Sequence, residues 1–373
     1  MSLRHASYLL TPGPVTVSDQ VKKQMMFDRS ANSAVVIEMT KFIRSYLLEI
    51  CNGTKDYECV PLQGSATYAV EAAFQTLVPR GSGVLVIENG HYGARMSMLA
   101  EAVGMRVQRL SFPLYPLPTA AEVEAALEAD PSLEYVGICH VETSTGALNP
   151  IEEIAAVARR MGRKIIIDAV ASFGGIPIDL PSLDAEALII SPNKCLEAVP
   201  GVGIVIAKRD VLEQSQGRSL SPCLDLYDQW KFLDANGFFR WTPPTHVLGA
   251  LGEALKIHKE EGGVAPRHAR YKGHWERLVN AMRQRGFTTL LPDEANAPIV
   301  TSFYDLKHPK FSFEALFASL EKRSIIIFPG RFPAQGTFRI GVMGDLVTED
   351  IDLIIHSIDE ALEEMGIETG SDL

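Results

Sequence analysis

Two polar side chains with complementary chemistry follow two apolar runs near the middle of this sequence. Asp168 comes directly after the three isoleucines at 165–167, and Lys194 stands shortly after the run at 187–190. Such runs predict strands buried on both faces, and open α/β sheets bind ligands at the carboxyl ends of their strands. A lysine can hold an aldehyde as a Schiff base, and a carboxylate can keep a pyridine nitrogen protonated. The pair therefore indicates a site for a pyridine-aldehyde cofactor.

Three other segments carry side chains that suit the same kind of ligand. The glycine-serine turn at 64–67 leads into an alanine-rich helix, so its backbone N–H groups can bind a phosphate, although such a turn is often only a helix cap. Tyr92 follows the predicted strand at 84–87 and can stack on an aromatic ring or close the core. Thr143 follows the predicted strand at 135–141.

The elements that must position these residues alternate between strand and helix over residues 60–208. This alternation predicts a mostly parallel sheet with right-handed crossovers, in which the carboxyl ends of the strands share one edge. We expect the turn at 64–67, Tyr92, Thr143, Asp168 and Lys194 to meet at that edge. Five chemically suitable loops at one edge favour a cofactor site over coincidence.

Composition limits the classes of protein that fit. The chain has 373 residues, enough for two domains, with 46% hydrophobic and 22% charged residues. No apolar run approaches the roughly 18 residues of a membrane span, and the N-terminus lacks a secretory signal, so we expect a cytoplasmic protein. The net charge of −11 argues against nucleic-acid binding. The five cysteines have no paired CxxC spacing, so no metal site is predicted.

We expect three parts along the chain. Residues 1–14 form an N-terminal arm that packs near the small domain, residues 15–260 form the large cofactor-binding domain, and residues 261–373 form a small α+β domain. Residues 213–244 read as a long irregular loop before the end of the large domain. In the small domain the pattern predicts helices at 274–284, 313–322 and 348–365, and strands at 299–303, 325–328 and 338–342.

Arg339 interrupts an apolar strand of the small domain. Arginine is rarely buried without a partner, so either it pairs with a structural acid or it faces the cleft as a fork for an anionic substrate group. We favour the second reading. Arg331 is a second candidate cation, with a solvated surface arginine as the alternative.

Taken together, these motifs resemble the class V, fold-type I PLP-dependent aminotransferases. The likeness runs from residues 11–14 to 339–341 and is carried by the motifs at 63–71, 89–95, 142–146, 168–175 and 193–195. The segments at 224–230, 244–246 and 261–268 look like the branch that transfers an amino group from 2-aminoethylphosphonate to pyruvate. Residues 29–33 depart from the tryptophan- and aspartate-rich stretch of that branch, which leaves the amino donor open.

The resemblance implies a fold, a cofactor and a set of roles. The fold would be a large, mostly parallel α/β/α sandwich with a smaller C-terminal α+β domain, and the cofactor pyridoxal 5'-phosphate. Lys194 would bond to the cofactor and move the proton in the 1,3-shift, while Asp168 would hold the pyridine nitrogen. Tyr92 and Val170 would cover the two ring faces, and Thr143 would bind the ring hydroxyl.

The resemblance also assigns the phosphate and the substrate. The phosphate would be surrounded by Ser65, Ala66, Thr67 and Asn193, with Thr242 arriving from the second subunit of a homodimer. Arg339 would bind the anionic group of the substrate, with Arg331 as the second candidate.

Three other kinds of enzyme are alternatives to this assignment. A serine or alanine:glyoxylate aminotransferase of the same class would carry the same cofactor residues, and it is the nearest alternative. A desulfurase needs a cysteine on a mobile loop, and residues 323–344 contain none. A nicotinamide-dependent dehydrogenase would need a GxGxxG turn after its first strand, which this chain lacks.

Overall fold

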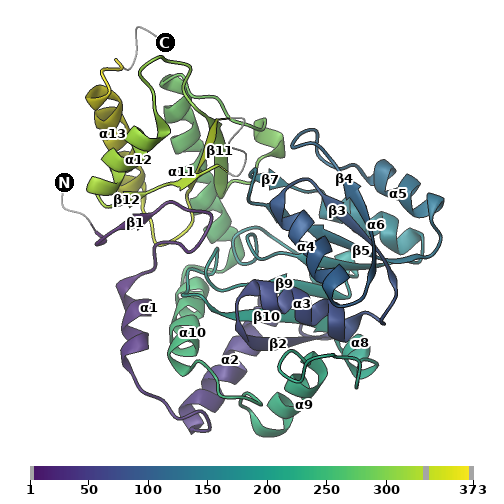
Figure 1. Cartoon of the computed structure of the whole chain (residues 1–373). Coiled ribbons are helices and arrows are strands. Elements are labelled where there is room, and N and C mark those ends of the chain that lie inside the picture. The colour runs from purple at the N-terminus through teal and green to yellow at the C-terminus, as the bar shows by residue number, and fades with distance from the viewer. Residues whose placement is uncertain (1–3, 331–335, 369–373) are drawn as a thin grey trace.

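The computed structural model describes residues 4–330 and 336–368 and contains a seven-stranded sheet at its centre (Figure 1). All neighbours in this sheet are parallel except for β10, which runs antiparallel to both β2 and β9. In spatial order the strands are β2 (Tyr57–Gly64), β10 (Gly201–Lys208), β9 (Ala187–Ile190), β8 (Lys164–Asp168), β5 (Leu133–Cys139), β3 (Gly83–Glu88) and β4 (Arg106–Ser111).

Helices cover both faces of this sheet. The alternation of side chains along a strand explains why: Ile165 and Ile167 pack into one hydrophobic core, and Ile166 packs into the other. The helices here are α1 (Asp19–Lys23), α2 (Ala34–Ile50), α3 (Ala66–Leu77), α4 (His91–Ala102), α5 (Ala120–Ala129), α6 (Ile151–Arg160), α7 (Leu180–Leu183), α8 (Arg209–Glu213), α9 (Leu226–Asn236) and α10 (Thr245–Glu260). The mostly parallel α/β/α architecture expected from the sequence is confirmed.

The C-terminal part builds a separate, smaller core. Its antiparallel sheet has the order β11 (Val300–Tyr304), β14 (Thr337–Gly341), β13 (Phe328–Pro329), and it packs with α11 (Val264–Gln284), α12 (Phe313–Lys322) and α13 (Thr348–Glu364). Tyr8 and Leu10 of the N-terminal arm belong to this same core. The arm joins it because β1 (Tyr8–Leu9) pairs in parallel with β12 (Ile325–Ile326), as Figure 1 shows.

Three local predictions differ from the structure. The loop expected at 213–244 contains α9, which Asp225 caps at one end and Gly237, with φ +78°, ends at the other. The helix expected from residue 274 begins at Val264, because Pro266 lies in the first turn, where a helix needs no N–H donor. The strand expected at 325–328 is two short strands, since residue 327 separates pairing with the arm from pairing with β14.

The parallel strands bring the predicted site loops to one edge. Asp168 ends β8, Lys194 follows β9, and α4 with Tyr92 follows β3. The short hairpin of β6 (Val141–Glu142) and β7 (Ala147–Leu148) follows β5 and carries Thr143. Within the described residues, no helix is long and apolar enough to cross a membrane.

Candidate active site

Lys194 is enclosed by protein, with 8% of its surface exposed. Its Nζ donates a hydrogen bond to the carbonyl oxygen of Pro12 in the N-terminal arm. Burial lowers the pKa of this amine to about 8; Arg95 and Arg339 act in the same direction and Asp168 opposes them. About 10% of such amines are neutral at pH 7, against fewer than about 0.1% for an ordinary lysine. Lys194 can therefore act as a nucleophile and as a proton acceptor.

Asp168 is a buried acid on the strand next to that of the lysine. Its Oδ1 accepts a hydrogen bond from the N–H of Val170 at 2.9 Å, and burial raises the pKa of its carboxyl group. The backbone beside it is fixed by His140, whose N–H donates to the Asp168 carbonyl at 2.8 Å. A buried carboxylate of this kind favours a cationic partner, such as a protonated pyridine nitrogen.

Tyr92 and Thr143 are joined by a residue to which the sequence assigned no role. The carboxylate of Glu142 accepts hydrogen bonds from the N–H groups of Tyr92 at 2.9 Å and Gly93 at 3.1 Å, at the start of α4. Glu142 directly precedes Thr143. One feature of the sequence could have pointed to Glu142: it is a charged residue at the end of an apolar run, where charged residues are unusual.

Arg95 was also missed. Its guanidinium carbon lies 4.4 Å from the centre of the Tyr92 ring, one helical turn along α4. It therefore covers one face of this ring, and its charge acts on both Asp168 and Lys194. The i, i+3 spacing of the two residues could have predicted this contact.

Arg339 lies on β14, is 1% exposed, and reaches across to the large domain. It donates to the carbonyl oxygen of Thr143 at 2.9 Å and to that of Pro329 at 3.0 and 3.3 Å. The charge of Arg339 contributes to the lowered pKa of Lys194, as the charges of Asp168 and Arg95 also affect it. We call these four side chains the Lys194 cluster. Arg331 lies outside the described residues.

The start of α3 is open to an anion. Ser65 is the N-cap residue but its side chain makes no capping hydrogen bond, and it is exposed. Ala66 and Thr67 form the first turn, so their N–H groups point out of the helix start. Gly203 of β10 allows this close approach, because a Cβ there would lie 2.5 Å from the Ser65 carbonyl oxygen. Asn193, next to Lys194, accepts a hydrogen bond from the Ser191 hydroxyl.

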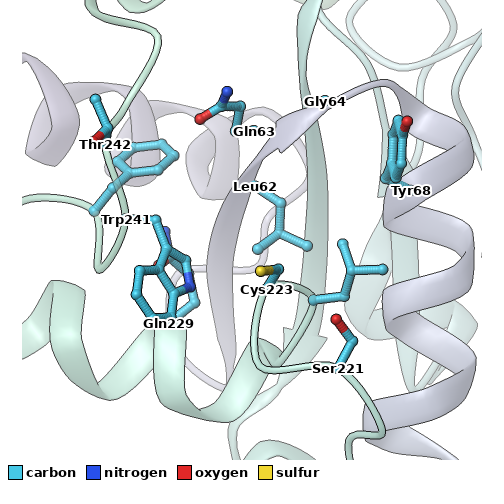
Figure 2. A pocket seen from close by; sticks show the side chains of 11 residues that line it. Leu62, Gln63, Gly64, Tyr68, Ser221, Cys223, Gln229, Trp241 and Thr242 are labelled. Carbon is cyan, nitrogen blue, oxygen red and sulfur yellow. The ribbon is translucent and has the colours of Figure 1, made fainter.

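Thr242 lines a groove whose lining residues include neither Lys194 nor Asp168. Thr242 is exposed, and the groove, of about 560 Å³, also contacts Gly64, beside the start of α3. Figure 2 shows Thr242 and Tyr68 on opposite sides of the strand that carries Leu62 and Gly64.

These residues fit pyridoxal 5'-phosphate. The cofactor has an aldehyde, a basic ring nitrogen and a phosphate, and the chain supplies a partly neutral lysine, a buried aspartate and an uncapped helix start for them. The described residues contain no cluster of His, Cys, Asp and Glu that could hold a metal ion.

Comparison with known proteins agrees with this chemistry. The family model for aminotransferase class-V matches residues 21–354. The chain belongs to the class V aminotransferases. A 2-aminoethylphosphonate–pyruvate transaminase of Syntrophobacter fumaroxidans is 43% identical over 96% of this chain and 97% of its own. One from Pseudomonas aeruginosa is 41% identical over 97% of this chain and 98% of its own.

Solved structures share the fold of this aminotransferase. The ureidoglycine-glyoxylate aminotransferase of Bacillus subtilis superposes with a TM-score of 0.89 at 22% identity, covering 100% of this chain and 96% of its own. The alanine–glyoxylate aminotransferase of Nostoc sp. has the same TM-score at 25% identity, covering 97% of each chain. The predicted fold type, enzyme class and cofactor, pyridoxal 5'-phosphate, are confirmed.

Proposed function

We propose that this enzyme transfers the amino group of 2-aminoethylphosphonate to pyruvate, giving phosphonoacetaldehyde and L-alanine, as a step of phosphonate breakdown. The observation that carries the proposal is the set of curated relatives, 39% to 43% identical, that bear this activity in their names. They align with 96% to 98% of the chain, so the small-domain arginine and the large-domain lysine both fall inside the matched region.

We assign the cofactor residues as follows. When bound, pyridoxal 5'-phosphate supplies a ring that withdraws electrons from the donor carbon after that carbon loses a proton. Lys194 is the base that takes this proton and returns it in the 1,3-shift, and Asp168 holds the ring nitrogen. The remaining contacts are Tyr92 and Val170 on the ring faces, Thr143 at the ring hydroxyl, and Ser65, Ala66, Thr67 and Asn193 at the phosphate.

Two cations are proposed for the anionic substrates. Arg339 binds the carboxylate of pyruvate or alanine, since its planar fork suits a carboxylate and it already lies in the Lys194 cluster. Arg331 is the second candidate, for the phosphonate. Arg29, in the divergent segment, is engaged elsewhere because it donates to the carbonyl and side-chain oxygens of Gln24, both at 2.8 Å.

A homodimer in which Thr242 crosses to the partner's phosphate site is part of this proposal. The groove beside Thr242 is bordered by Trp241 and Tyr68, which are 51% and 52% exposed, and large exposed apolar side chains of this kind mark interfaces.

We also propose a cytoplasmic location, supported by five free cysteines. The division into an arm (1–14), a large domain (15–260) and a small domain (261–373) is likewise our proposal.

The test is to supply single amino donors to the cofactor-loaded enzyme with pyruvate and to measure alanine. We expect 2-aminoethylphosphonate to give alanine and phosphonoacetaldehyde in equal amounts, and a Lys194→Ala variant to give neither. Rapid alanine formation from serine, with none from 2-aminoethylphosphonate, would contradict the substrate assignment and favour another class V activity. Light scattering of the purified enzyme tests the dimer separately.

A further inference from the structure

Glu142 is a buried acid that the proposed reaction does not use. It is 0% exposed, and four hydrogen-bond donors converge on its carboxylate. Two of them are the N–H groups of Tyr92 and Gly93, on Oε2. The other two are the N–H of Ser144, at 3.1 Å from Oε1, and the hydroxyl of the same serine. All four of these groups are hydrogen-bond donors. An ionised carboxylate, which can only accept, suits such surroundings.

These contacts join two segments that are 50 residues apart in sequence. One side of the carboxylate holds the first turn of α4, where an anion is favoured by the partial positive charge of the helix start. The other side holds the turn that follows Thr143. A second link runs beside the first, because the Ser144 hydroxyl accepts a hydrogen bond from the N–H of His91 at 3.1 Å.

The backbone leaves room for this acid. Gly90 precedes α4, and a Cβ at this position would lie 2.4 Å from Glu142 Cγ and 2.5 Å from the Ser144 hydroxyl oxygen. Any larger residue would therefore push the carboxylate and the helix start apart. The sequence thus supplies both a buried acid and the space that lets it reach two loops.

We propose that Glu142 is a positioning residue that fixes Tyr92 and Thr143 relative to each other before the cofactor binds. Tyr92 covers one face of the cofactor ring and Thr143 meets its hydroxyl group in the function proposed above, so the inference rests on those two roles. It does not rest on the choice of amino donor. A buried charge is costly unless it is well hydrogen-bonded, and here its partners are the two loops that must stay in register.

Glu142→Gln is the first test, because glutamine keeps the shape of the side chain but replaces one acceptor with an NH₂ donor. We expect pyridoxal 5'-phosphate to bind the cofactor-free variant about 10- to 100-fold more weakly, the loss that corresponds to one hydrogen bond to a charged group. We also expect an altered visible circular dichroism of the bound cofactor, since the ring changes its orientation. Fluorescence titration and dichroism measure these two effects.

Glu186→Gln is the matched control. Glu186 is also a buried glutamate, 6% exposed, but it precedes β9 and so lies at the opposite edge of the sheet from Lys194. We expect this variant to bind the cofactor with the affinity and dichroism of the unmodified enzyme. If Glu142→Gln and Glu186→Gln lower the melting temperature alike and leave cofactor affinity alike, Glu142 has a structural role only and the proposal fails.

Ser144→Ala keeps the proposal testable if Glu142→Gln does not fold. It removes one donor to the carboxylate and the link to His91 while leaving three backbone N–H groups in place. We expect cofactor binding to weaken by about 3- to 10-fold, since the two hydrogen bonds that are lost are each worth only about 1 kcal/mol or less. Unchanged affinity in this variant overturns the proposal. A wrong amino donor would instead appear in the unmodified enzyme, with its cofactor affinity intact.

Discussion

The Nζ of Lys194 donates its hydrogen bond to the carbonyl oxygen of Pro12, 182 residues earlier in the chain. Pro12 belongs to the arm that continues from β1, and β1 pairs with β12 in the C-terminal core. The amine is thus held by a segment anchored outside the sheet that carries the lysine. When Lys194 is not bonded to a ligand, the carbonyl oxygen of Pro12 can accept a hydrogen bond from its amine.

Gly13 is the residue most sensitive to this arrangement. A Cβ at Gly13 would lie 2.4 Å from Lys194 Cδ and 2.7 Å from Nζ, and its φ of +119° disfavours any other residue. We expect Gly13→Ala to displace the lysine and to lower kcat/KM on the order of 10²-fold, as small shifts of a reacting group do. Steady-state kinetics measure this loss.

Gly81→Ala is the control for backbone strain. Gly81 also has a positive φ, +85°, but nothing lies within 4 Å of a Cβ built there. The Gly81→Ala variant should therefore lose some stability and keep its activity. Equal losses of kcat/KM in the two variants would mean that strain, and not contact with Lys194, explains the effect of Gly13→Ala.

The lowered pKa of Lys194 predicts a stability that depends on pH. The unfolded amine has a pKa near 10.5 and the folded one about 8, so between these values the unfolded state binds more protons and stability rises with pH. Burying the charged amine costs at most about 3.5 kcal/mol. The full cost applies only below pH 8, where the amine is charged in both states. We expect cofactor-free Lys194→Met to melt higher than the unmodified protein at pH 7, with the gap closing towards pH 10. Calorimetry at pH 7, 8.5 and 10 tests this, and a constant gap would contradict it.

Much of the candidate site could be predicted because buried parallel strands impose strong sequence patterns. Asp168 and Lys194 follow apolar runs, and the geometry of parallel sheets then places both at one edge. The start of α3 could be predicted for a similar reason, since a glycine-serine turn before an alanine-rich segment has few other structural readings.

What the sequence did not predict depends on tertiary contacts between distant segments. The local sequence around Pro12 does not predict that its carbonyl oxygen accepts a hydrogen bond from Lys194, because that contact requires the arm to pair with β12. Glu142 lay inside a recognised motif, yet its partners are backbone N–H groups, which carry no side-chain signature. The helix α9 was not predicted because its aromatic residues lower the local helix propensity, although Asp225 and Gly237 cap its two ends.

Asp168→Asn should separate stability from function. The carboxyl group is buried and its pKa is raised by burial, so replacing it with a neutral amide of the same shape removes an unfavourable charge. We expect the cofactor-free variant to melt at the same temperature or higher. Loss of the charged hydrogen bond that we propose to the ring nitrogen, worth about 1.5–3 kcal/mol, should weaken cofactor binding about 10- to 100-fold.

Asp184→Asn is the control for this prediction. Asp184 has a side chain that is 49% exposed and pairs with Lys208 beside the amino end of β9, far from the lysine edge. Its replacement should leave cofactor affinity unchanged. If Asp168→Asn bound the cofactor as tightly as Asp184→Asn does, the assignment of Asp168 to the ring nitrogen would be wrong.

Arg339→Lys tests the proposal that Arg339 binds the anionic group of the substrate. The guanidinium holds the carbonyls of Thr143 and Pro329 and belongs to the Lys194 cluster, and a lysine keeps the charge but not the planar fork. We therefore expect KM for pyruvate to rise about 10-fold or more, the cost of about one charged hydrogen bond, with a smaller change in kcat. Arg323→Lys is the control, because Arg323 pairs with Glu360 and Glu364 on α13. Initial rates over a range of pyruvate concentrations decide the matter: a KM equal to that of Arg323→Lys would remove Arg339 from the substrate site.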